Sequence, residues 1–80
     1  MNEKEMIDII NEILEDINED ILLYEGNNMM EDGIIDSFEL IRIVNELEET
    51  FKFEIDAKYI SEGYFNSKES IYKLVKMLSL

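Results

Sequence analysis

The chain has 80 residues, of which 46% are hydrophobic, and it carries 20 acidic against seven basic side chains for a net charge of −13. This length fits one domain with a small helical core and is too short for a sizeable enclosed active site. The negative surface argues against nucleic acid and anionic lipid as ligands, and it attracts basic protein patches.

The absent residue types limit the chemistry further. Without cysteine there are no disulfides, no thiolate metal site and no cysteine nucleophile. Without histidine no Ser–His pair can activate a serine for attack. We therefore expect a protein that is not an enzyme and has no catalytic residues of its own.

The N-terminal segment 1–5 lacks the basic region and the apolar core of a signal peptide. Apolar runs reach only about four residues, far short of a membrane span. These features predict a cytoplasmic monomer that does not insert into membranes.

Apolar residues recur at helical spacing over residues 3–17, which predicts a first helix there. Residues 18–36 follow as a long loop, because Gly26, Asn28 and Gly33 are turn formers. Loops of this length are usually functional or held down by their own apolar residues. The candidates for that role here are Ile21, Leu22, Met29, Met30 and Ile35.

A second helix is predicted from Ser37 to Phe51, with Asp36 or Ser37 as its cap and Glu39 completing a capping box. One face of this helix is apolar and should lie in the core. Its members are Leu40, Ile43, Val44, Leu47 and Phe51.

Two further helices complete the chain. Asp56 caps a short helix that runs through Ile60 and ends near Gly63. Ser67 opens the last helix, but no Glu stands at its capping-box position, so we expect that box to be incomplete. Its inward residues are Ile71, Leu74, Val75 and Leu78. The prediction is a single domain over residues 1–80, an all-α, small four-helix bundle with three main helices, one short helix and a long first loop.

Ser37 stands at the first turn of the second helix, where unpaired backbone N–H groups and the helix macrodipole favour a phosphate ester. The outward face of this helix offers an apolar contact at Phe38 and Ile41 beside the serine. Acidic residues on the helix should steer basic partners at a rate that falls with salt. The predicted partner-binding residues are Phe38, Glu39, Ile41, Arg42, Glu46, Glu48 and Glu49.

These features resemble the acyl and peptidyl carrier protein family over nearly the whole chain. The similar segments are residues 33–37, which read Gly-Ile-Ile-Asp-Ser, and the stretches 47–51 and 54–56. The resemblance implies a carrier fold in which Ser37 receives 4′-phosphopantetheine from coenzyme A through a separate transferase. Asp36 matches the acidic residue that helps to hold a metal ion during this transfer in relatives.

The same resemblance implies the partners. They are a phosphopantetheinyl transferase, an acyl- or aminoacyl-activating ligase, and a downstream synthase or transferase with a basic docking surface. Within the family the pattern is similar both to D-alanyl carrier proteins and to stand-alone peptidyl carrier proteins. The Gly-x-x-Asp-Ser arrangement at residues 33–37 and the long segment 51–67, which ends in Tyr-Phe-Asn-Ser, carry this similarity. The cargo and the pathway stay open.

Two other functions compete with the carrier reading. Residues 28–39 match part of the calcium-binding loop of an EF-hand, with Gly33 at position six and Glu39 at position twelve. Met30 stands at position three, where calcium needs an oxygen donor, so no metal site is expected. The second alternative is an acidic helical adaptor without a prosthetic group, since periodicity alone does not distinguish it from a carrier.

Overall fold

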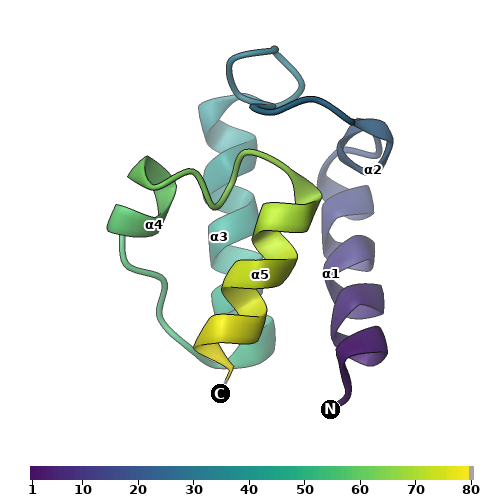
Figure 1. Cartoon of the computed structure of the whole chain (residues 1–80), viewed down its shortest axis with the longest axis vertical. Coiled ribbons are helices and arrows are strands. Elements are labelled where there is room, and N and C mark those ends of the chain that lie inside the picture. The colour runs from purple at the N-terminus through teal and green to yellow at the C-terminus, as the bar shows by residue number, and fades with distance from the viewer. Residues whose placement is uncertain (80) are drawn as a thin grey trace.

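The computed structural model describes residues 1–79, and Leu80 lies outside the described residues. Five helices form the fold: α1 (Glu3–Ile17), α2 (Asp20–Leu23), α3 (Ser37–Phe51), α4 (Lys58–Ser61) and α5 (Lys68–Leu78). In Figure 1, α1 runs opposite to α3 and α5, so the two ends of the chain lie at one end of the molecule and the start of α3 lies at the other. The predicted small all-α fold with three main helices is confirmed.

The two long helices predicted first, α1 and α3, have the bounds that their periodicity indicated. Asn2 begins α1, and its side chain accepts a hydrogen bond from the backbone N–H of Glu5 at 2.8 Å. Lys52 ends α3 in the left-handed conformation. Such long segments are predictable because each buries a continuous apolar face.

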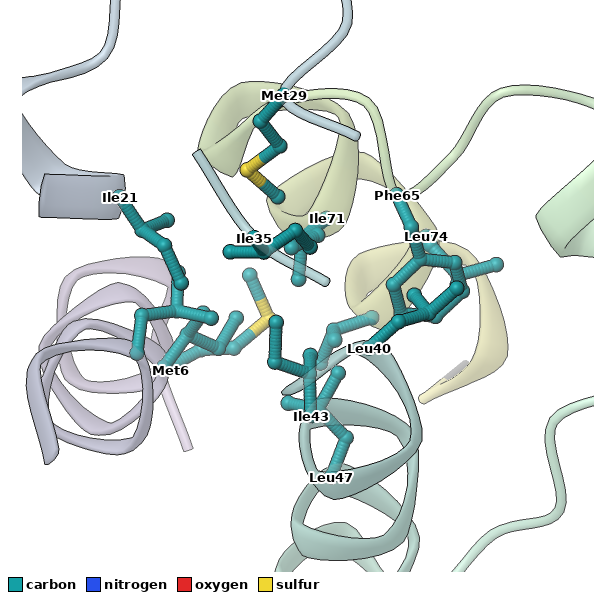
Figure 2. Packing of buried hydrophobic residues seen from close by; sticks show 13 residues of the cluster. Met6, Ile21, Met29, Ile35, Leu40, Ile43, Leu47, Phe65, Ile71 and Leu74 are labelled. Carbon is teal, nitrogen blue, oxygen red and sulfur yellow. The ribbon is translucent and has the colours of Figure 1, made fainter. Parts of the chain in front are cut away.

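The hydrophobic core lies between α1, α3 and α5, and side chains from the connecting segments complete it (Figure 2). Val44, Phe51 and Leu78, which we expected inside, are only half-buried at its margin. The buried core residues are Met6, Ile10, Leu14, Ile21, Met29, Ile35, Leu40, Ile43, Leu47, Phe65, Ile71, Leu74 and Val75.

The segment between α2 and α3 is held to the core by Met29. Its side chain is fully buried and points toward Ile35 and Ile71 in Figure 2. Its backbone N–H donates to the Asn66 carbonyl at 2.9 Å, and its carbonyl accepts from the Ile34 N–H at 2.8 Å. Met30, expected to help, is exposed instead. Met29 thus ties this segment to the residues before α5 through its backbone, and to the core through its side chain.

The predicted first loop contains a helix that the sequence did not indicate. Residues 20–23 form α2, in which Ile21 is buried. Four residues are too few for a periodic pattern, and the turn formers later in the same segment favoured a loop. The fold therefore has two short helices rather than one.

The starts of α4 and α5 differ in detail from expectation. The helix α4 begins at Lys58 rather than directly after Asp56, whose Oδ1 atom accepts from the Lys58 N–H at 2.8 Å. The box at the start of α5 is complete, contrary to the prediction, because the Ser70 hydroxyl takes the place of a carboxylate. It accepts from the Ser67 N–H at 3.0 Å, and the Ser67 hydroxyl accepts from the Ser70 N–H at 3.2 Å.

Met29→Ala should lower the free energy of unfolding by about 2–5 kcal/mol, because it removes a fully buried side chain and leaves a cavity. Met30→Ala is the matched control and should change it by no more than about 0.5 kcal/mol, since Met30 is exposed. Urea denaturation followed by circular dichroism measures both. Equal effects of the two substitutions would contradict the role given to Met29.

Candidate functional site

The start of α3 is closed by a reciprocal capping box. The Asp36 Oδ1 atom accepts from the Glu39 N–H at 2.8 Å, and the Glu39 Oε1 atom accepts from the Asp36 N–H at 3.1 Å. These two bonds satisfy donors that would otherwise lack a partner at the helix end. Of the two residues proposed as the cap, Asp36 fills the role and Ser37 does not.

Ser37 is the first residue of α3, and its side chain is not needed to cap the helix. Its side chain is exposed, and within residues 1–79 no hydrogen bond involves its hydroxyl. Leu40 donates to the Asp36 carbonyl at 3.0 Å, whereas the N–H groups of Ser37 and Phe38 have no acceptor in this part of the chain. Within residues 1–79, a hydroxyl and two backbone donors without partners thus lie next to one another at the start of α3, which is an arrangement suited to a phosphate ester.

The approach to Ser37 is fixed by a tight turn. Gly33 has a φ of 75°, in the left-handed region where a side chain is unfavourable. The following N–H groups of Ile34 and Ile35 both donate to the Met29 carbonyl, and the Ile35 side chain is buried. The chain is thus pinned directly before Asp36.

Tyr24 closes the outer part of the same segment. Its hydroxyl donates to the Asp32 carboxylate at 2.6 Å and accepts from the Asn28 N–H at 2.6 Å. Burial of the ring raises the pKa of the Tyr24 hydroxyl, and the bond to Asp32 raises it further. The phenol accordingly keeps its proton, which the bond to the carboxylate requires.

Asn18, which the sequence analysis did not single out, lies beside the capping box. Its Nδ2 atom donates to the Ile34 carbonyl at 2.9 Å and to the Glu39 Oε2 atom at 3.2 Å. The only sequence signal was an asparagine directly after a predicted helix, which is common at helix ends. Its contacts to residues 16 and 21 positions away arise from the tertiary fold.

The structure divides the predicted partner residues into two groups. Phe38 is 80% exposed and Ile41 is 56% exposed, and Arg42, Glu46 and Glu49 are exposed with them. We refer to these five residues as the α3 outer face. They share one side of the helix beside Ser37, because they recur at helical spacing.

The other two carboxylates are engaged within the protein. Glu39 belongs to the capping box, and the Glu48 Oε2 atom accepts from the Ile55 N–H at 2.8 Å. Both side chains are half-buried. They contribute negative charge near the α3 outer face but are less free than Glu46 and Glu49 to form a contact with a partner.

A groove of about 720 Å³ lies beside the C-terminal half of α3, away from Ser37. It is lined by residues of α3, by the segment 53–59 and by Leu78. Apolar side chains such as Phe53 and Tyr59 alternate there with carboxylates such as Glu54 and Asp56. The sequence analysis did not predict it.

The residues of the EF-hand-like loop do not converge on one point. Glu39 would be the bidentate calcium ligand, but both of its oxygens accept hydrogen bonds from the protein. Within residues 1–79, no group of three or more acidic side chains is placed to hold a metal ion. In the same part of the chain, no helix has the length and apolar content needed to cross a bilayer.

Asp36→Ala should lower the free energy of unfolding by about 0.5–2 kcal/mol, because the Glu39 N–H loses its acceptor. Asp36→Asn is the matched variant, since it retains a capping oxygen while removing the charge, and it should stay close to the wild type. Thermal and urea unfolding measure both. A wild-type stability for Asp36→Ala would show that the box contributes nothing.

Comparisons of the chain with protein-family models, with curated protein sequences and with solved structures found no match.

Proposed function

We propose that this chain is an acyl or aminoacyl carrier protein that bears 4′-phosphopantetheine on Ser37. The observation that carries the proposal is the separation of roles at the start of α3. Asp36 and Glu39 satisfy the helix end, and the adjacent serine hydroxyl is exposed and unused within the described chain. A serine needed only as a cap would have its hydroxyl bonded to the backbone, as the Ser67 hydroxyl is.

The residues around Ser37 fit a phosphate diester. The N–H groups of Ser37 and Phe38 are available as donors, and the positive end of the α3 macrodipole favours the negative charge. The Asp36 Oδ1 atom is held by the Glu39 N–H, which leaves the second carboxylate oxygen free to accept a cation during transfer. When bound, the group supplies a thiol that carries the cargo as a thioester.

The chain itself performs no chemistry in this proposal. Its role is to present the thioester in turn to an activating ligase and a downstream synthase or transferase. Residues 36–51 contain five carboxylates against one guanidinium, which favours enzymes with basic docking surfaces. The α3 outer face adds an apolar contact at Phe38 and Ile41, next to the attachment point.

Ser37→Ala should abolish attachment. Incubation of the wild type with coenzyme A and a phosphopantetheinyl transferase of broad specificity should add one phosphopantetheine mass by intact-mass spectrometry. Ser67→Ala is the matched control, because Ser67 also begins a helix but uses its hydroxyl as the cap, and it should be modified like the wild type. A wild type that stays unmodified with several transferases would refute the proposal and favour the adaptor alternative.

Phe38→Ala should slow transfer onto Ser37 with little change in melting temperature, because the side chain is 80% exposed and contributes little to the core. Met77→Ala is the control, since Met77 is also exposed but lies in the last turn of α5, at the opposite end from Ser37 (Figure 1). The initial rate of transfer and the melting curve give the two readouts. Transfer at the wild-type rate in Phe38→Ala would remove Phe38 from the docking surface.

A further inference from the structure

Asn18 connects four parts of the fold through one side chain. Its Nδ2 atom reaches the Ile34 carbonyl and the Glu39 carboxylate, and its Oδ1 atom accepts from the Asp20 N–H at 3.0 Å. The end of α1, the start of α2, the segment before α3 and the α3 capping box therefore meet at this carboxamide. The side chain is half-buried, so water competes only partly for these bonds.

The hydrogen bonds of Asn18 use its full donor capacity. A carboxamide has two N–H donors, and both find an acceptor here, at 2.9 Å and 3.2 Å. No other side chain of this length offers two donors and an acceptor together. The bond from the Asn18 backbone N–H to the Leu14 carbonyl, by contrast, is available to any residue except proline. The helix end therefore does not explain why the side chain is asparagine.

The bonds of Asn18 lead directly to Ser37. Ile34 stands three residues before the serine, and Glu39 stands two residues after it. While Glu39 accepts from Asn18 through Oε2, it accepts from the Asp36 N–H through Oε1. The Asn18 side chain thus holds the residues on both sides of Ser37 in a fixed position relative to the end of α1.

We propose that Asn18 is a positioning residue for the transfer of phosphopantetheine to Ser37. This inference rests on the proposed function. In that transfer the Ser37 oxygen forms a bond to phosphorus as the phosphoanhydride of coenzyme A breaks, adenosine bisphosphate leaves, and the hydroxyl proton passes to a base of the transferase. Asn18 touches neither reactant, and it acts by holding Glu39 and Ile34 so that the first turn of α3 presents the hydroxyl in one orientation.

Asn18→Asp is the most direct test. Aspartate has the same shape and keeps the acceptor for the Asp20 N–H, but it replaces both donors by an oxygen that faces the Glu39 carboxylate. We expect kcat for transfer to fall about tenfold or more with little change in KM, since misplacement of a reacting group affects the chemical step. Amide hydrogen exchange at Glu39, whose N–H bonds to Asp36, should accelerate.

Asn11→Asp is the matched control. It adds the same charge at another half-buried asparagine, within α1, and it keeps the oxygen that accepts from the Tyr72 hydroxyl. Both variants therefore share the change in net charge, and with it any general effect of one extra carboxylate on long-range attraction of the transferase. Assays are run well below the melting temperature of each variant. We expect Asn11→Asp to retain the wild-type kcat and the wild-type exchange at Glu39.

A second substitution tests the route through Glu39. In Asn18→Asp/Glu39→Gln, the glutamine can accept from the Asp36 N–H and donate its amide to Asp at position 18, which restores that link in the opposite direction. In Glu39→Gln alone, the glutamine amide faces the Asn18 amide, so two donors meet without an acceptor. Transfer to this variant should be slower than to the wild type. The double variant should be faster than Asn18→Asp, a non-additivity that a general loss of stability does not produce.

The outcomes separate the two proposals. A wild type that accepts no phosphopantetheine overturns the proposed function, and the role of Asn18 with it. A wild type that is modified, with Asn18→Asp matching it in kcat and in Glu39 exchange, overturns the role of Asn18 alone. If Asn18→Asp does not fold, Asn18→Ala removes the donors without adding a charge, and a wild-type kcat in that variant also overturns the role.

Discussion

Burial of Met29 is the constraint on which the rest of the structure depends. The segment between α2 and α3 contains few apolar residues that reach the core, and Met29 is fully inside. Its backbone carbonyl accepts from Ile34 and Ile35, so the position of the buried side chain determines where the chain turns into α3. The hydrophobic burial of Met29 thereby fixes the position of the exposed N-terminal end of α3.

The start of α3 shows how a serine hydroxyl can be left free of hydrogen bonds at a helix N-terminus. The first N–H groups of any helix need acceptors, and the side chain nearest to them normally supplies one. At α3 this demand is met from both sides of Ser37, by Asp36 before it and Glu39 after it. Ser70 and Ser67 satisfy the same demand at α5, but there both hydroxyls are used. Of the two serines that stand at the starts of long helices, only Ser37 keeps its hydroxyl free of hydrogen bonds within the described chain.

The long elements and part of the site could be predicted from the sequence. Apolar spacing gave the bounds of α1 and α3, and the Asp36–Glu39 spacing indicated the capping box. Exposure of Phe38 followed from its place opposite Leu40 and Leu47 on the helix. These features depend on neighbours within one helix, where the repeat of 3.6 residues relates sequence to position.

The features that were missed depend on contacts between distant segments. The helix α2 is shorter than one period of any reliable pattern, and its Ile21 is recognisable as core only once α1 is in place. From the sequence, Asn18 is indistinguishable from an ordinary residue at a helix end. Its role depends on the contact with Glu39, which only the tertiary fold creates. The replacement of a carboxylate by Ser70 shows the same limit, because a hydroxyl can reach the cap only in a particular rotamer. Local pattern thus located the helix end, and tertiary contacts determined how it is held.

The charge of −13 destabilises this small core through repulsion between carboxylates. Within residues 1–79 there are three ion pairs, and two of them join exposed side chains, so most of the carboxylates repel one another without compensation. In the same residues, four carboxylates accept hydrogen bonds from backbone N–H groups and so support the fold, at Asp36, Glu39, Glu48 and Asp56. Glu46 and Glu49 are exposed and outside these bonds, which suits them to attract a basic partner rather than to support the helix.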